Sequence, residues 1–157
     1  MYGTVLPAED ARELRDLAGQ AVENAAVFLD RDGLIIRDVN YLRHKCQIQI
    51  MPHARESLLM LQEFFYLIIV TNQSGVARGI FTEQQLSAIH SNLVSNLECM
   101  GVVMDAIYYC PHHPDAKVEK YRIKCNCRKP NPGMLIGASI AWDLDLSCSY
   151  MLGDKDT

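Results

Sequence analysis

Two apolar runs constrain the fold of this 157-residue chain most strongly, because polar residues follow each of them at once. Residues 27–29 lead into Asp30 and Asp32, and residues 66–70 lead into Thr71. Short continuous apolar runs of this kind are typical of strands buried on both faces of a parallel sheet. In open α/β sheets, ligands bind outside the carboxyl ends of the strands, so these polar side chains stand where a site is expected.

Helical periodicity fills the chain between the strand-like runs. Apolar side chains recur at three- and four-residue spacing, and Thr82 with Gln85 has the pattern of a helix capping box. Strands that alternate with helices predict right-handed βαβ crossovers. We therefore expect an α/β, Rossmann-like fold with a mainly parallel sheet and helices on both faces. The expected strands cover residues 27–29, 66–71, 106–109 and 149–154, and the expected helices cover residues 52–64, 82–97 and 131–142.

The N-terminal part of the chain precedes this pattern. We expect loose backbone over residues 1–7 and an amphipathic helix over residues 9–24, so that residues 1–25 form an N-terminal extension. Residues 26–157 then form the only folded domain. Within it, residues 34–51 lack clear periodicity and follow Asp32 closely, so we expect a loop or small flap over the site.

Composition and charge limit the possible partners. Hydrophobic residues make up 49% of the chain and charged residues 22%, which is enough apolar material for the core of one domain. The net charge of −4 provides no global attraction for nucleic acid or for an anionic membrane surface, and we expect neither partner. No apolar run approaches the roughly 20 residues that span a bilayer. We expect a soluble, cytoplasmic protein.

The polar residues at the strand ends match the needs of phosphoryl transfer. A carboxylate such as Asp30 is ionised at neutral pH and can attack phosphorus without an activating base. The hydroxyl of Thr71 and the backbone amides after it can hold phosphate oxygens, and Lys129 can supply a fixed cation. Asp30, Asp154 and the backbone carbonyl of Asp32 can bind Mg²⁺. Each residue alone has a simpler explanation, such as a solvated charge or a turn, but their coincidence favours a site.

A second cluster of residues has the spacing of a metal site. Cys110, His112, Cys125 and Cys127 supply three thiols and one imidazole, which suits tetrahedral Zn²⁺ with no open position, and therefore a structural ion. His113 competes with His112, and we favour His112 because a Cys-x-His pair then matches the Cys-x-Cys pair. Free thiols beside surface histidines are the simpler alternative. The remaining cysteines, which we expect to be small buried hydrophobes, are Cys46, Cys99 and Cys148.

The segment from Asp30 to Gly33 resembles the first motif of the haloacid dehalogenase-like phosphatases. The resemblance implies that Asp30 is the nucleophile that becomes an aspartyl-phosphate and that Asp32 carries the proton. The later motifs follow in the order usual for that superfamily. By the same resemblance, the catalytic set is Asp30, Asp32, Thr71 and Lys129, and the Mg²⁺ ligands are Asp30, Asp32 and Asp154.

Within the superfamily, the chain resembles the D-glycero-D-manno-heptose 1,7-bisphosphate 7-phosphatases from about Ala26 onward. The segments that carry this resemblance begin at Leu29, Thr71, Tyr109, Cys125 and Gly153. It implies Mg²⁺-dependent removal of the 7-phosphate during nucleotide-heptose synthesis for surface polysaccharide, a structural zinc and no large cap domain. Arg128 beside Lys129 gives a second cation for the phosphate that stays. The implied substrate contacts are Asp38, Val39, Asn40, Tyr41, Asn72, Gln73, Ser74, Arg128 and Lys155.

Three features depart from that family. Leu34 replaces a hydroxyl residue, the segment before Ala26 is longer, and Thr157 ends the sequence where the family continues with an acidic residue, a strand and a helix. We therefore expect a domain that lacks these C-terminal elements. The family domain would be a monomer, whereas this chain could self-associate through the strand edge that ends at Asp154.

Two other functions stay open. Histidinol-phosphate phosphatases share the Asp-x-Asp and zinc motifs, although the loop between the zinc-ligand pairs is longer here. An inactive binding module on the same zinc-stapled scaffold is the second alternative. Neither a Gly-x-Gly-x-x-Gly nor a Walker loop follows any expected strand, which disfavours a nucleotide-binding fold.

Overall fold

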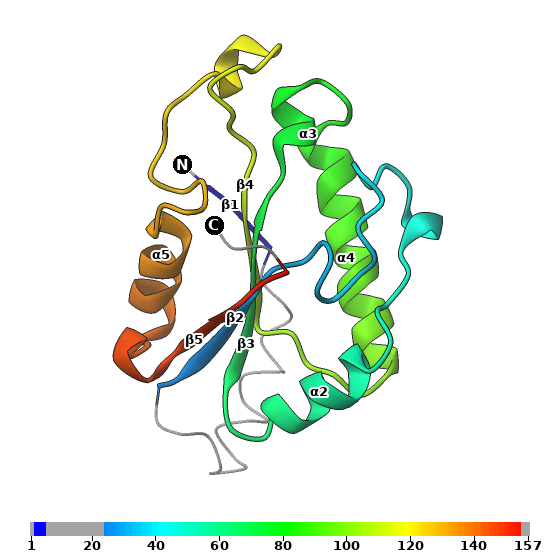
Figure 1. The fold of residues 1–157 in the computed structure, drawn as a ribbon, viewed down its shortest axis with the longest axis vertical. Coiled ribbons are helices and arrows are strands. Elements are labelled where there is room, and N and C mark those ends of the chain that lie inside the picture. Colours follow the sequence, from blue (N-terminus) through cyan, green and yellow to red (C-terminus); the bar gives the residue numbers. More distant parts are fainter. Residues whose placement is uncertain (1, 6–23, 155–157) are drawn as a thin grey trace.

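A five-stranded sheet forms the centre of the computed structural model, which describes residues 2–5 and 24–154 (Figure 1). The strand order is β1-β4-β3-β2-β5. All neighbouring pairs are parallel except β1 with β4, which is antiparallel. The strands are β1 Gly3–Val5, β2 Ala26–Leu29, β3 Tyr66–Asn72, β4 Ala106–Cys110 and β5 Tyr150–Leu152. The expected mainly parallel sheet is confirmed.

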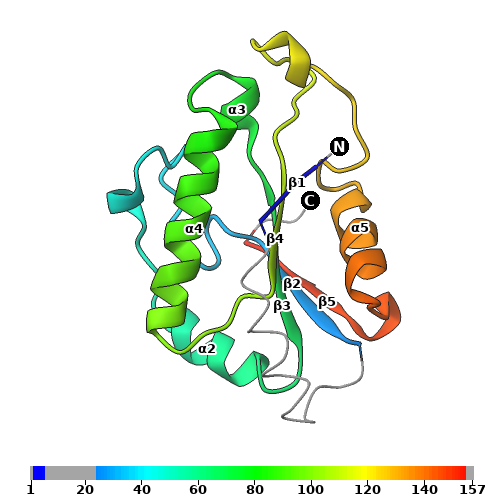
Figure 2. The ribbon, with the colours of Figure 1, turned by 180° about the vertical axis from the view of Figure 1, so that it is seen from behind.

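Helices cover both faces of the sheet, as expected (Figures 1 and 2). α2, α3 and α4 lie on one side in both views, and α5 lies on the other. Of these helices, α4 is the longest and α3 is a single turn. Their bounds are α2 Ala54–Leu61, α3 Ser74–Ala77, α4 Glu83–Cys99 and α5 Gly133–Trp142. Short 3₁₀ turns cover Lys45–Gln47, Glu119–Tyr121 and Leu146–Cys148.

Side chains of β3 alternate between two hydrophobic clusters. Leu67 and Ile69 pack with residues of α2 and α4, whereas Ile68 and Val70 pack with residues of α5. All four side chains are fully buried. A strand buried on both faces reads as a continuous apolar run, which is why the sequence marks β3 so clearly.

α2, α4 and α5 lie where the sequence predicts helices, with ends that differ by up to three residues. The capping box of α4 is present: Thr82 Oγ1 accepts from Gln85 N at 3.2 Å, and Gln85 Oε1 accepts from Thr82 N at 2.8 Å. α2 begins at Ala54 rather than at Pro52. His53 precedes it in the left-handed region, at φ 64°, so the backbone turns there before the helix starts.

The N-terminal residues were only partly predicted. We expected loose backbone over residues 1–7, but Gly3–Val5 forms β1 and pairs with β4 from Gly3 opposite Tyr109. This prediction was wrong because a three-residue edge strand has too little pattern to be recognised, and its partner strand provides the pairing. The helix expected over residues 9–24 falls almost entirely outside the described residues, and so does most of the extension over residues 1–25.

Residues 34–51 form the expected loop next to the site, and part of it enters the core. Ile35 and Ile36 are fully buried, and Ile36 makes isolated bridges with Asp32 and with Ile50. These contacts attach the loop to the end of β2. No helix among the described residues has the length and apolar character that crossing a membrane requires.

Candidate active site

A cavity of about 320 Å³ opens at the carboxyl ends of β2 and β3. Most of the site residues predicted from the sequence surround it. Asp30 and Asp32 follow β2, Thr71 lies near the end of β3, and Lys129 comes from the loop before α5. The residues that line the cavity are Asp30, Arg31, Asp32, Asp38, Asn40, Tyr41, Thr71, Asn72, Gln73, Ser74, Gly75, Arg128 and Lys129.

The carboxylate of Asp30 is held by one cation and one backbone N–H. Its Oδ2 lies 2.7 Å from Lys129 Nζ, and its Oδ1 accepts from the backbone N–H of Arg31 at 2.8 Å. The side chain of Lys129 is only 10% exposed, so its charge is poorly screened by water. Asp30 is thus fixed in position while about a fifth of its side chain still faces solvent.

The carboxylate of Asp32 is oriented by two side chains. Arg31 donates to it from Nε at 3.2 Å and from Nη2 at 2.9 Å to each oxygen. Gln73 Nε2 donates to Asp32 Oδ2 at 3.0 Å and to Thr71 Oγ1 at 2.9 Å. The amide of Gln73 therefore ties together two predicted catalytic groups. Although Gln73 lines the cavity as predicted, its amide contacts protein groups rather than pointing freely at a ligand.

Asn72 holds the backbone of Lys129 on both sides. Its Nδ2 donates to Lys129 O at 3.1 Å, and its Oδ1 accepts from Lys129 N at 3.0 Å. Arg128 Nη1 in turn donates to the backbone oxygen of His112 at 3.3 Å. Asn72 was predicted to contact substrate, but in this structure its amide positions the cation that pairs with Asp30.

The loop over the site carries unusual backbone. Asn40 and Tyr41 have φ angles of 50° and 76°, and Asp38 Oδ1 accepts from Asn40 N at 2.9 Å. Two successive non-glycine residues in this region store strain, which is typical of loops that position functional groups. Val39 does not line the cavity, and its side chain packs against the core instead. The predicted contact of Val39 with substrate therefore stays a prediction, and its side chain gives it no support.

Asp154 lies beside the turn that follows Asp32. Gly33 has a φ of 86°, and a Cβ at that position would overlap the carboxylate of Asp154. Only glycine provides both the conformation and the space. The backbone N–H of Asp30 also donates to Leu152 O at 2.9 Å, which joins the ends of β2 and β5. Asp154 does not line the cavity, and Lys155 is outside the described residues.

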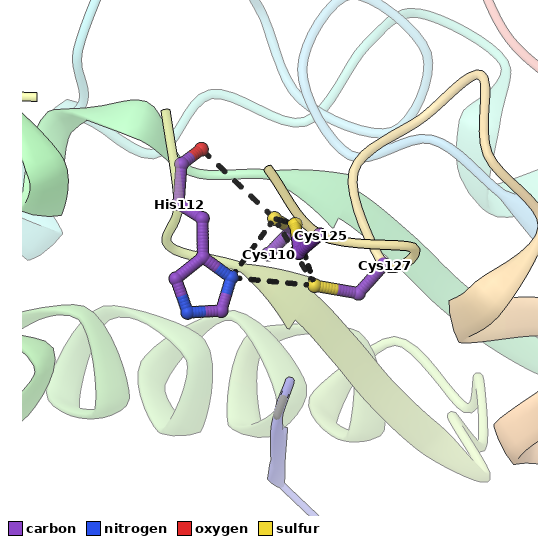
Figure 3. A group of neighbouring side chains, drawn as sticks. All are labelled: Cys110, His112, Cys125 and Cys127. Atoms are coloured by element: carbon purple, nitrogen blue, oxygen red, sulfur yellow. Dashed lines mark hydrogen bonds between the residues drawn. The ribbon is translucent and has the colours of Figure 1, made fainter. Parts of the chain in front are cut away.

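Three thiols and one imidazole converge beyond the end of β4 (Figure 3). The Sγ atoms are 3.2 to 3.6 Å apart, and His112 Nδ1 lies 3.4 Å from Cys127 Sγ and 3.7 Å from Cys110 Sγ. Tetrahedral zinc with Zn–S bonds of about 2.3 Å separates two sulfurs by about 3.8 Å. The cluster, which includes His112, is therefore compatible with zinc. His113 is not part of the cluster, and its Nδ1 accepts from Asp115 N at 3.1 Å.

Burial shifts the protonation of this cluster. Burial raises the pKa of the Cys110 thiol and lowers the pKa of His112. The protein alone thus keeps the imidazole neutral, which is the form that binds metal, and disfavours an uncompensated thiolate.

Cys46, Cys99 and Cys148 are exposed, so the prediction that they are buried was wrong. They lie at element ends or in loops, where an apolar residue need not face the core.

Sequence reasoning overlooked the role of Arg31. An arginine between two aspartates reads as a solvated charge, yet Arg31 is only 1% exposed and donates to the carboxylate of Asp32. It also overlooked Glu83, which accepts hydrogen bonds from Tyr109 at 2.9 Å and from Tyr121 at 2.5 Å. These bonds attach β4 and the loop after it to α4. Neither role has a local sequence signal. An arginine beside two aspartates is equally consistent with a solvated surface charge, and the two tyrosines are 26 and 38 residues away from Glu83 in the sequence.

Comparison with known proteins identifies the family. No family model matches the chain. A D-glycero-beta-D-manno-heptose-1,7-bisphosphate 7-phosphatase of Photorhabdus laumondii is 47% identical over 131 residues, which cover 83% of this chain and 70% of that protein. Its counterpart in Escherichia coli K12 is 44% identical over the same length and is covered to 69%. The chain belongs to the heptose-1,7-bisphosphate 7-phosphatase family.

Solved structures agree with membership of this family. A putative haloacid dehalogenase-like phosphatase from Mesorhizobium loti superposes with a TM-score of 0.84 and 30% identity, over 98% of this chain and 70% of that one. The D,D-heptose 1,7-bisphosphate phosphatase of B. bronchiseptica, solved with magnesium and phosphate, gives a TM-score of 0.71 and 34% identity, over 83% of this chain and 70% of that one. The fold is thus haloacid dehalogenase-like, as the sequence predicted, and the described residues show no large cap.

Proposed function

We propose that this chain is a Mg²⁺-dependent phosphatase that removes the 7-phosphate of D-glycero-D-manno-heptose 1,7-bisphosphate, in nucleotide-heptose synthesis for surface polysaccharide. The observation that carries the proposal is the Asp30 carboxylate, fixed 2.7 Å from Lys129 Nζ at the mouth of a cavity. The names of the relatives supply the substrate. These relatives are named as phosphatases, which disfavours an inactive binding module.

The chemistry follows from the two carboxylates. A carboxylate oxygen of Asp30 attacks phosphorus, and the bond from phosphorus to the sugar oxygen breaks. Asp32 gives a proton to the leaving oxygen, which forms the sugar hydroxyl. Water then attacks the aspartyl-phosphate and passes its proton to Asp32, so that phosphate leaves and Asp30 is restored. Arg31 and Gln73 keep Asp32 in one orientation through both steps.

Other residues bind the charged parts of the substrate. Lys129, Thr71 and the backbone amides after Asn72 stabilise the negative oxygens of the transferring group. Arg128 stands next to Lys129 on the cavity wall and can hold the phosphate that is not cleaved, since a guanidinium binds phosphate in a bidentate manner. Asp38, Asn40 and Tyr41 lie on the loop over the cavity, where they can contact sugar hydroxyls.

Two metal ions fit the residues present. Asp30, Asp154 and the backbone carbonyl of Asp32 are hard oxygen donors that suit Mg²⁺, and the tight approach of Asp154 to Gly33 brings them to one end of the sheet. Mg²⁺ bound there would neutralise phosphate charge. Cys110, His112, Cys125 and Cys127 would hold a structural Zn²⁺. Thiols at such a site need a reducing compartment, so we propose that the protein works in the cytoplasm.

Phosphate release from a panel of substrates tests this function. We expect rapid release from heptose bisphosphate with Mg²⁺, little release when EDTA replaces Mg²⁺, and slow release from histidinol phosphate. Histidinol phosphate carries one phosphate and leaves Arg128 without its partner. Faster turnover of histidinol phosphate would favour the alternative activity.

Asp32→Asn is expected to slow the reaction most for substrates whose leaving group needs a proton. We expect kcat/KM for heptose bisphosphate to fall by about 10²- to 10⁴-fold, because an amide cannot protonate the sugar oxygen. p-Nitrophenyl phosphate, whose leaving group needs little protonation, should lose much less. Steady-state kinetics with both substrates measures the difference, and equal losses would contradict the role of Asp32 as the acid.

We also propose that this 157-residue chain self-associates through β5. Within the described part of the chain, β5 pairs with β2 alone, and Tyr150, Met151 and Leu152 are 60%, 41% and 40% exposed. An apolar edge strand of this kind invites pairing with another chain. We expect Met151→Lys to lower the mass measured by light scattering toward that of the monomer. Ile140→Lys, at an exposed position of α5, is the control and should leave it unchanged. A wild-type chain that is monomeric at all concentrations would contradict the proposal.

A further inference from the structure

A buried histidine on α4 lies directly behind the catalytic carboxylates. His90 is fully buried, and its Nε2 lies 3.0 Å from Nη1 of Arg31. The other nitrogens of the same guanidinium bind Asp32, and Nη2 also donates to Gln73 Oε1 at 3.1 Å. The side chain of Arg31 thus binds groups from three segments of the chain. Among the residues that the structure describes, its only ion-pair partner is Asp32.

The direction of the hydrogen bond fixes the state of His90. A guanidinium can only donate, so Nε2 of His90 must be the acceptor and the ring must be neutral, with its proton on Nδ1. Burial and the charge of Arg31 both lower the pKa of His90, which agrees with this state. His90 therefore serves as an acceptor and does not itself exchange protons with the substrate.

The stability of the fold does not by itself explain a histidine at this position. His90 Nδ1 is buried and has no hydrogen-bond partner within the described segments, and the ring packs edge-on against Tyr109 at 5.4 Å. An unpaired buried donor destabilises a fold, and a leucine at this position would avoid that cost. The compensating contact is the bond to Arg31, whose other donors bind Asp32 and Gln73.

We propose that His90 is a positioning residue, which holds the guanidinium of Arg31 in the one orientation that aims the carboxylate of Asp32 into the cavity. Without the acceptor at Nε2, Nη1 of Arg31 is left unpaired in the core, and the guanidinium turns or shifts to recover a partner. Asp32 then loses its fixed orientation. Displacing a catalytic group by about 1 Å can cost up to about 100-fold in rate.

Three substitutions of His90 separate this role from simple packing. A glutamine side chain there can bring its Oε1 to the place of Nε2, an asparagine brings its Oδ1 only to the place of Nδ1, and a leucine offers no acceptor. We expect His90→Leu and His90→Asn to lower kcat/KM for heptose bisphosphate about 10- to 100-fold with little change in KM, and His90→Gln to stay within about threefold of wild type. p-Nitrophenyl phosphate, which needs little protonation, should lose less than about threefold in every variant.

Leu93→Ala is the matched control, because it weakens the same face of α4 without touching Arg31. We expect Leu93→Ala to lower the melting temperature about as much as His90→Leu does, but to keep the kcat/KM of the wild type. Equal kcat/KM for His90→Leu and Leu93→Ala, or a His90→Gln variant no better than His90→Asn, would overturn the proposal. Because the role of Asp32 rests on the proposed function, the wild-type chain is assayed alongside, and its failure to hydrolyse heptose bisphosphate would count against that function instead.

A measurement without turnover tests the contact itself. The Nε–H of Arg31 can be followed by ¹⁵N NMR in the full chain. We expect His90→Leu and His90→Asn to shift and broaden this signal and His90→Gln to leave it close to its wild-type position. An Arg31 signal that all three variants leave unchanged would refute the positioning role, whatever the activity of the enzyme.

Discussion

Asp30→Asn is expected to abolish phosphate release, lowering kcat by about 10⁴-fold or more, as loss of a covalent nucleophile does in other enzymes. The substitution removes the attacking charge and almost no volume. It also leaves Lys129 Nζ without the carboxylate that lies 2.7 Å away. Because the strand and loops around residue 30 are held by backbone hydrogen bonds, the fold should persist. Single-turnover phosphate release, with zinc content and circular dichroism measured in parallel, checks the result.

Asp143→Asn is the matched control for this change. Asp143 is exposed at the end of α5, and its φ of 53° suits asparagine as well as aspartate. It loses the same charge far from the cavity, so its activity should equal that of the wild type. Measurable turnover by pure Asp30→Asn protein would rule out Asp30 as the nucleophile.

Cys125→Ser is expected to lower both zinc content and thermal stability. Wild-type protein should contain close to one Zn²⁺ per chain, since its four donor atoms lie within 4.8 Å of one another. A structural zinc contributes about 10 kcal/mol or more to the folding of small domains. Part of that suffices to lower the melting temperature of a domain of this size by about 10 °C or more. Elemental analysis and calorimetry measure the two effects.

The same substitution should reduce activity, because the zinc loop continues into the site. Arg128 follows Cys127 directly and donates to His112 O, and Lys129 comes next. Cys99→Ser, at an exposed position, is the control and should change neither zinc content nor activity. A Cys125→Ser variant with wild-type zinc content and melting temperature would exclude the structural role of the metal.

The strands β2 to β5 and the places of most candidate site residues could be predicted because their signals are local. β3 is a continuous apolar run that leads into Thr71, and parallel strands bring their carboxyl ends to one edge, so Asp30 and Thr71 had to lie close together. The cluster of three thiols and one imidazole could be predicted equally well, because this combination at close spacing is typical of metal sites. The choice of His112 over His113 also followed from spacing.

The features that were missed depend on contacts between distant segments. β1 is three residues long and owes its structure to pairing with β4. Arg31 and His90 are 59 residues apart, and their contact exists only once α4 packs on the sheet. The helix and strand propensities of single residues carry no information on contacts between residues so distant in sequence.

The most direct test of the central proposal is ³¹P NMR of the reaction of pure wild-type chain with heptose 1,7-bisphosphate and Mg²⁺. The account predicts loss of the 7-phosphate signal, growth of inorganic phosphate in equal amount and a persistent 1-phosphate signal, with no reaction when EDTA replaces Mg²⁺. Loss of the 1-phosphate instead, or no phosphate release by folded, zinc-loaded protein, would contradict it.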